Sequence, residues 1–66
     1  MKNNVRELRK DLKLTQAELA SKLNVSRQTV NAIESGDYNP STSLAIKLSK
    51  LFEKTVNEIF FLEDHD

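Results

Sequence analysis

Residues 15–36 read TQAELASKLNVSRQTVNAIESG, and the rest of the fold can be built around this segment. Thr15 and Glu18 have the spacing of a capping box, in which the threonine hydroxyl accepts from the Glu18 N–H and the carboxylate accepts from the Thr15 N–H. A helix is therefore expected to begin at Thr15. Asn24 tolerates the left-handed conformation at a helix end, and Ser26 is a preferred N-cap. The segment predicts two short helices joined by a turn of three residues.

The short turn constrains how the two helices meet. It is too short for a shallow antiparallel hairpin, so a crossing angle of roughly 90–120° is expected. Val30 and Ile33 would hold the second helix of the pair against the core. The opposite face of that helix carries Arg27, Gln28 and Asn31. Arginine can bond guanine, and Gln or Asn can bond adenine, through paired hydrogen bonds in the major groove, so this face suits double-stranded DNA.

Outside this segment the apolar residues also recur at helical spacing. Gly36 and Pro40 are the only glycine and proline, and they lie in one loop, which leaves little room for a turn-rich β fold. We expect a first helix over about residues 4–12 and a fourth and a fifth helix over about residues 41–60. The predicted fold class is all-α with five helices. A short β pairing of the two terminal segments is left open.

The predicted first and fifth helices have short apolar faces. In the first, Leu12 is expected to point inward together with the apolar residues one and two turns before it. In the fifth, Thr55 and Glu58 repeat the capping-box spacing. Val56, Ile59 and Phe60 would then point inward.

The composition excludes several classes of protein. A chain of 66 residues is expected to form one domain, residues 1–66, and without cysteine it has neither disulfides nor thiolate metal sites. No segment has the length of a membrane span or the apolar core of a signal peptide, so we expect a cytoplasmic protein. No nucleophile, base or metal-ligand cluster is evident, which argues against an enzyme, a metal, a cofactor or a small-molecule ligand.

The net charge is zero, but the charges are unevenly distributed along the chain. Residues 1–36 carry seven basic and four acidic groups, whereas residues 37–66 carry three basic and six acidic groups. The positive half therefore contains the predicted helix pair, which is consistent with a polyanionic partner.

Residues 14–20 (LTQAELA), 25–30 (VSRQTV), Ile33-Glu34 and Gly36 together resemble the Xre-type helix-turn-helix family, which includes the lambdoid phage repressors. The resemblance covers about residues 4–62 and implies a five-helix, phage-repressor-like DNA-binding domain, with its helix-turn-helix unit at about residues 15–36. It implies base contacts by Arg27, Gln28 and Asn31. It implies contacts to the DNA backbone by Thr15, Gln16, Ser26, Thr29 and Asn39. It also implies a structural ion pair between Arg9 and Glu34.

The C-terminal segment is unusually apolar for so small a domain. Phe61 and Leu62 have few places to be buried, and an exposed apolar patch usually marks an interface. The predicted interface of a homodimer consists of Val56, Ile59, Phe60, Phe61 and Leu62. A dimer would place two recognition helices about 34 Å apart, as a pseudo-palindromic operator requires. Repression is favoured over activation, since repression needs only occupancy of a promoter.

A protein-interaction module on the same fold is the competing interpretation. An antitoxin or partner-binding subunit would not read bases with its third helix. The neutral net charge favours this interpretation slightly. Asp37 also favours it, because the resemblance implies that lysine is common at this position in the family. The carboxylate-free face at Arg27, Gln28 and Asn31 favours DNA.

Overall fold

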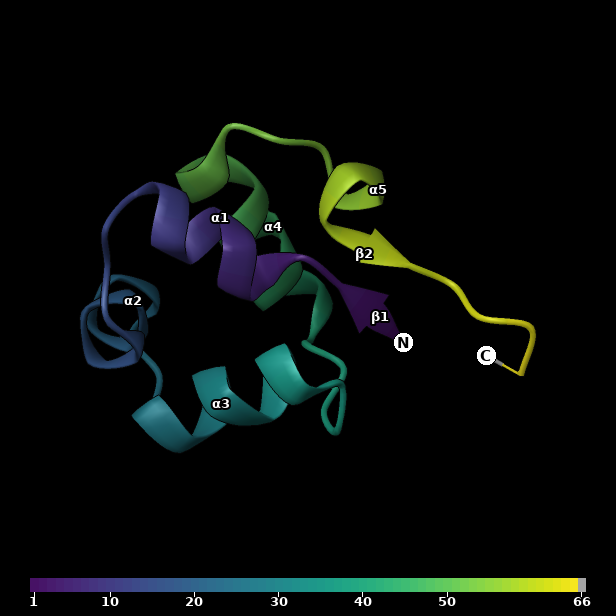
Figure 1. Ribbon diagram of the computed structural model, residues 1–66, viewed down its shortest axis with the longest axis horizontal. Coiled ribbons are helices and arrows are strands. Elements are labelled where there is room, and N and C mark those ends of the chain that lie inside the picture. The colour runs from purple at the N-terminus through teal and green to yellow at the C-terminus, as the bar shows by residue number, and fades with distance from the viewer. Residues whose placement is uncertain (66) are drawn as a thin grey trace.

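The computed structural model describes residues 1–65. Its elements in chain order are β1 (Lys2–Asn3), α1 (Val5–Asp11), α2 (Gln16–Leu23), α3 (Arg27–Ser35), α4 (Thr42–Phe52), α5 (Val56–Ile59) and β2 (Phe60–Phe61). Figure 1 shows α3 along the lower edge of the molecule, α2 at one end, and α5 with the two strands at the other end. The predicted helical fold class is confirmed.

The helices begin where side chains cap their first turns. Thr15 and Thr55 each form a complete capping box with the glutamate three residues later. Ser26 and Ser41 accept hydrogen bonds from the backbone N–H groups of Thr29 and Leu44. Each of these caps satisfies backbone donors that the first turn of a helix otherwise leaves unpaired. The helix starts inferred at Thr15, Ser26 and Thr55 are therefore confirmed.

Left-handed residues end three of the helices. Asn24 ends α2 with φ 60°, Gly36 ends α3 with φ 85°, and Glu53 ends α4 with φ 55°. Asn24 therefore does take the place of a turn glycine, as expected. Only residues 24–26 separate α2 from α3, so the two helices pack against each other next to this turn.

The core gathers buried side chains from every helix. Its fully buried large members are Val5, Leu19, Leu23, Val30, Ile33, Leu48 and Ile59. Burying one such side chain stabilises the fold by about 1.5–3 kcal/mol, so this core outweighs any single surface contact. Val30 and Ile33 belong to it, which means that α3 presents its opposite face outward.

Two residues that we expected to point inward are exposed. Leu12 has 48% of its surface accessible, because α1 ends at Asp11 and the chain turns through Lys13 at φ 59°. Leu14 packs against the core instead. Val56 occupies the first turn of α5 and is also exposed, since that helix has only four residues and buries Ile59.

The two termini pair as a short antiparallel ribbon. Lys2 lies opposite Phe61 and Asn3 lies opposite Phe60. The Asn4 N–H donates to the Ile59 carbonyl at 3.0 Å, which extends the connection to α5. The terminal pairing left open by the sequence is therefore present, and Phe60 belongs to a strand rather than to the fifth helix.

The ribbon corrects the predicted dimer interface. Ile59 is fully buried and Phe60 is only 8% exposed, because both pack into the core of their own chain. Neither side chain has the surface needed to contact a second copy.

Among the described residues, no helix has the length and apolarity needed to cross a bilayer.

Candidate nucleic-acid interface

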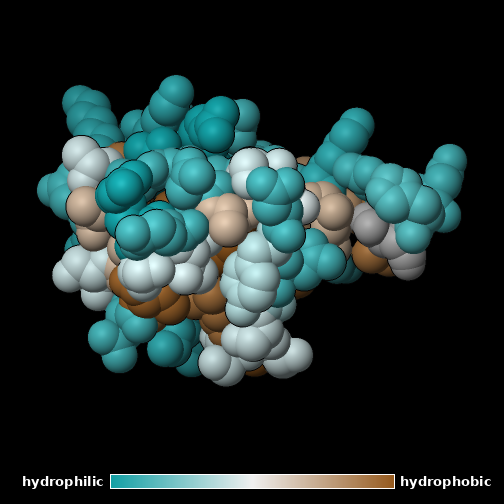
Figure 2. All heavy atoms as spheres, turned by 90° about the horizontal axis from the view of Figure 1, so that it is seen from below, coloured by the Kyte–Doolittle hydropathy of each residue, from teal (hydrophilic) through white to brown (hydrophobic). Residues whose placement is uncertain are grey.

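Helix α3 has one buried face and one polar face. Val30 and Ile33 are buried against the core, and Arg27, Gln28 and Asn31 are exposed. Gln28 and Asn31 are three residues apart and Arg27 and Asn31 four apart, so the three side chains share one side of the helix. Figure 2 views the molecule from the α3 side, where hydrophilic side chains cover most of the surface. The polar face of α3 is therefore available to a partner.

The N-terminus of α3 is organised by two hydroxyl groups. Ser26 Oγ accepts from the Thr29 N–H at 3.1 Å and lies 2.9 Å from Thr29 Oγ1. Ser26 is exposed and Thr29 is half-buried. The cap leaves the positive end of the helix dipole beside these hydroxyls, an arrangement suited to an anion such as a phosphate.

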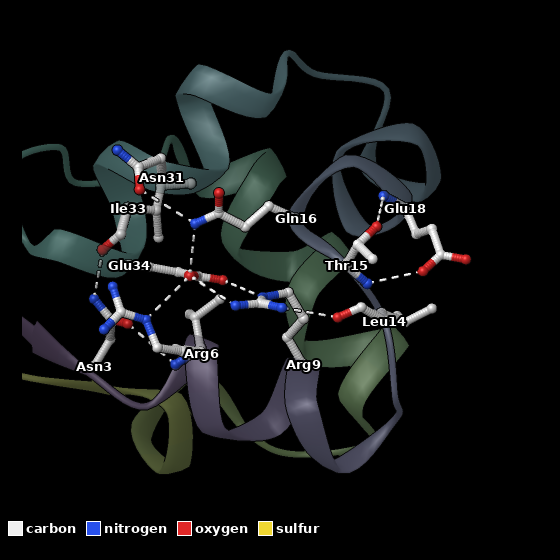
Figure 3. Close-up of polar contacts among 11 residues, drawn as sticks. Asn3, Arg6, Arg9, Leu14, Thr15, Gln16, Glu18, Asn31, Ile33 and Glu34 are labelled. Atoms are coloured by element: carbon white, nitrogen blue, oxygen red, sulfur yellow. Dashed lines mark hydrogen bonds and ion pairs between the residues drawn. The ribbon is translucent and has the colours of Figure 1, made fainter.

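Beneath this face, a buried carboxylate joins α1 to α3. The side chain of Glu34 has no exposed surface, and that of Arg9 is 11% exposed. Arg9 Nε lies 2.6 Å from Glu34 Oε2, and Arg9 Nη2 lies 3.3 Å from Oε1. Arg9 Nη1 also donates to the Leu14 carbonyl at 2.8 Å. One guanidinium therefore holds together α1, the loop before α2, and α3 (Figure 3).

The surroundings of Glu34 keep it ionised. Burial alone would raise its pKa, but the hydrogen bonds from Arg9 and Gln16, together with the charge of Arg9, outweigh burial and lower the pKa below its ordinary value of 4.5. Arg6 adds a longer contact of 3.4 Å from the exposed side of α1. Glu34 is therefore a hydrogen-bond acceptor at neutral pH.

A bridge from the start of α2 reaches the same carboxylate. Gln16 Nε2 donates to Glu34 Oε1 at 3.0 Å and to Asn31 Oδ1 at 3.2 Å (Figure 3). Gln16 is half-buried, whereas Asn31 is exposed. The amide nitrogen of Gln16 therefore forms hydrogen bonds that link α2 to α3, and it is not free for a DNA contact alone.

The remaining predicted backbone contacts lie at the edges of this face. Thr15 is exposed at the start of α2, where its oxygen accepts from the Glu18 N–H at 3.0 Å. The return bond from the Thr15 N–H lowers the pKa of Glu18. Asn39 is exposed in the loop after α3. In the same loop, Asp37 Oδ2 lies 3.1 Å from Ser35 Oγ, which places a carboxylate close to the C-terminal end of α3.

The chain matches a known family over most of its length. The sequence profile of the helix-turn-helix family aligns with residues 5–59. The chain belongs to the Xre-type helix-turn-helix family. Helices α2 and α3 occupy the places of the two helices of this motif, whose second helix is the one that enters the major groove.

Relatives from an archaeon and a bacterium align along the whole chain. The sequence is 48% identical over 66 residues to an uncharacterized HTH-type transcriptional regulator of Methanocaldococcus jannaschii, and the match covers 100% of both chains. It is 46% identical over 66 residues to the uncharacterized HTH-type transcriptional regulator YgzD of Bacillus subtilis, again with 100% of both chains covered.

A solved structure supports the same fold. The restriction-modification controller protein C.AhdI from Aeromonas hydrophila superposes with a TM-score of 0.74 at 32% identity, covering 85% of each chain. The two proteins therefore share the helix-turn-helix fold.

Sequence patterns did not reveal the whole network around Glu34. The bridge from Gln16 to Asn31 joins residues 15 positions apart and depends on how α2 crosses α3, so no periodicity marks it. Arg6 could have been found, because it lies three residues before Arg9 on the same side of α1. A contact from Asn3 Nδ2 to the Ile33 carbonyl at 2.8 Å was also missed, since it depends on the terminal ribbon.

Within residues 1–65, no cluster of three or more His, Cys, Asp or Glu side chains has the arrangement to hold a metal ion. His65 Nε2 lies 3.2 Å from Glu63 Oε2 in the C-terminal segment.

Proposed function

We propose that this protein is a homodimeric repressor in which residues 1–66 act as one domain and α3 reads the major groove of a pseudo-palindromic operator. DNA-binding regulation of transcription is the function of the chain at the coarser level, given its family and its full-length relatives. The observation that carries the finer proposal is the exposed, carboxylate-free face of α3, backed by buried Val30 and Ile33.

The proposed base contacts come from Arg27, Gln28 and Asn31. The first turns of a recognition helix usually reach the base edges, and all three residues are exposed there or one turn later. Arg27 is suited to guanine because its guanidinium offers paired donors to O6 and N7. Gln28 is suited to adenine, since its amide offers both a donor and an acceptor.

The proposed backbone contacts come from two helix N-termini and one loop. Their residues are Thr15, Gln16, Ser26, Thr29 and Asn39. Hydroxyl groups and backbone N–H groups at helix starts are common partners of phosphate oxygens. Because the Gln16 amide nitrogen already bonds Glu34 and Asn31, we expect Gln16 to meet the phosphate through its backbone N–H.

The proposed dimer forms through the C-terminal ends of two chains. Val56, Phe61 and Leu62 remain exposed after Ile59 and Phe60 are buried, and Leu62 is 82% exposed. Covering these apolar side chains supplies a driving force for association. A dimer would double a set of DNA contacts that is small in one copy. Light scattering at micromolar concentration should give twice the mass of one chain.

Selection of bound sequences from random DNA tests the whole proposal. The expected result is a palindromic consensus whose half-sites lie about one helical turn apart, with affinity that falls steeply as salt increases. A reporter gene placed behind that consensus should be repressed. Binding that ignores DNA sequence, together with capture of a protein partner through α3, would instead favour a protein-interaction module.

A further inference from the structure

Gln16 connects α2 to α3 through a single nitrogen atom. Its Nε2 donates both to Glu34 Oε1 at 3.0 Å and to Asn31 Oδ1 at 3.2 Å. A carboxylate offers only acceptors, so the nitrogen end of the Gln16 amide must be the end that faces Glu34. That nitrogen carries two hydrogens, which match the two acceptors. The buried carboxylate therefore determines which way round the Gln16 amide lies.

The orientation of Gln16 is passed on to Asn31. Because Gln16 offers a hydrogen, Asn31 turns its Oδ1 toward it, and the amide nitrogen Nδ2 takes the other position. Figure 3 shows this nitrogen directed away from Gln16. Asn31 is exposed on the same side of α3 as Arg27 and Gln28. Position 31 therefore presents a hydrogen-bond donor to the partner of α3.

We propose that Glu34 and Gln16 are positioning residues that hold Asn31 as a donor toward an acceptor on DNA. The inference rests on the DNA-binding function proposed above. Its target chemistry is a hydrogen-bond acceptor, either a base-edge atom in the major groove or a phosphate oxygen. Glu34 itself has no exposed side-chain surface, so it acts through Gln16 and does not touch the DNA.

The bridge fixes which end of Asn31 donates. An asparagine bonds adenine through two contacts, accepting from N6 with its oxygen and donating to N7 with its nitrogen. In this chain Gln16 occupies one acceptor position of the Asn31 oxygen, and the second lone pair of that oxygen stays open. The nitrogen is suited to purine N7, which adenine and guanine share. If Asn31 meets a base edge, it should therefore prefer a purine.

A double-mutant cycle tests the coupling between the two amides. Gln16→Met removes the bridge but leaves the Arg9–Glu34 pair, so the variant should remain folded in thermal unfolding. Asn31→Ala should lower operator affinity about tenfold in the wild-type background and about twofold or less in the Gln16→Met background. Gln16→Lys still offers donors to both acceptors and should retain most of the coupling. Ser21→Ala, exposed on the same helix, serves as the control with unchanged affinity.

The same cycle on modified DNA identifies the acceptor. If the acceptor is purine N7, a 7-deaza purine at the contacted step should abolish the effect of Asn31→Ala. If it is a phosphate oxygen, a methylphosphonate linkage should abolish it, and the effect should be equal on operator and random DNA.

Two results would overturn the inference. Positioning would be refuted if Asn31→Ala lowered operator affinity equally in the wild-type and Gln16→Met backgrounds, or in neither. In that case, salt-dependent binding of the wild-type protein to the operator would still support the DNA-binding function. A wild-type protein with no operator preference would refute that function, and the inference with it.

Discussion

The α2–α3 pair and the α5–β2 segment place their apolar residues in opposite ways. In α2 and α3 the large apolar side chains are buried, and the exposed residues on the polar face of α3 are Arg27, Gln28 and Asn31. The segment formed by α5, β2 and the following Leu62 buries Ile59 and Phe60 but leaves Val56, Phe61 and Leu62 on the surface. The first region is complete within one chain and offers hydrogen bonds. The second has apolar surface, which the proposed dimer would cover.

The two regions also differ in how they are held in place. Helix α3 is attached through buried side chains and through the carboxylate of Glu34, which collects bonds from Arg9, Arg6 and Gln16. Strand β2 is attached by its pairing with β1 at the start of the chain and by Phe60, which packs into the core. A change at Glu34 should therefore affect folding. A change at the exposed apolar residues of the C-terminal segment should instead affect association.

The largest expected effect comes from breaking the attachment of α3. Glu34→Ala leaves the guanidinium of Arg9 without its partner in a nearly buried site, which should cost about 3–5 kcal/mol. A domain of this size has a total stability of roughly 3–10 kcal/mol, so much of the protein should unfold. Urea unfolding followed by circular dichroism measures the loss. The control Glu7→Ala, exposed on α1, should change little, and equal losses in both variants would contradict the special role of Glu34.

The next effect should separate association from folding. Leu62→Asp places a charge in the proposed interface and should yield a monomer by light scattering. Operator affinity should fall by about 100-fold as the second set of contacts is lost, while circular dichroism shows an unchanged helical content. Asp64→Asn, also exposed near the C-terminus, is the matched control. A Leu62→Asp variant that remains a dimer would place the interface elsewhere.

A smaller effect should be confined to the recognition face. Gln28→Ala should lose about 1–3 kcal/mol of discrimination at a single base step, because one paired contact to a base edge is removed. Competition binding with operators altered at each position measures this loss. The exposed α4 variant Ser43→Ala should discriminate as the wild type does. Unchanged discrimination by Gln28→Ala would remove this residue from the reading surface.

The smallest effect concerns acid pH. The pKa of Glu34 is lowered in the folded state, so its contribution to stability is fully present above its ordinary value of 4.5 and is lost as the pH falls through the lowered value. Hydrogen bonds from the backbone and hydroxyl of Thr15 lower the pKa of Glu18, and those of Thr55 lower the pKa of Glu58, in the same direction.

Substitution of the two capping glutamates would separate the contribution of Glu34 to acid sensitivity from those of Glu18 and Glu58. The double variant Glu18→Gln/Glu58→Gln retains side chains that can complete a capping box but cannot titrate. Urea midpoints between pH 7 and pH 3 should still fall in this variant, because Glu34 remains. A midpoint independent of pH in the double variant would show that Glu34 contributes nothing to the acid sensitivity.

Most helix boundaries could be predicted because local chemistry determines them. The capping boxes at Thr15 and Thr55, the cap at Ser26 and the left-handed ends at Asn24 and Gly36 each involve residues within one turn of one another. The outward face of α3 followed from the spacing of Val30 and Ile33. By contrast, the expectations for Leu12 and Val56 were wrong, since each lies where a helix ends or begins and small changes in boundary redirect a side chain.

By itself, then, the sequence determined the five helices, the buried side of α3 and the family, because caps and periodic apolar residues act over three or four positions. Only the tertiary structure decided that Phe60 lies in a strand opposite Asn3, and that Gln16 bridges Asn31 and Glu34. Such contacts depend on the angle at which separate elements pack. That angle arises from the whole core rather than from any local pattern.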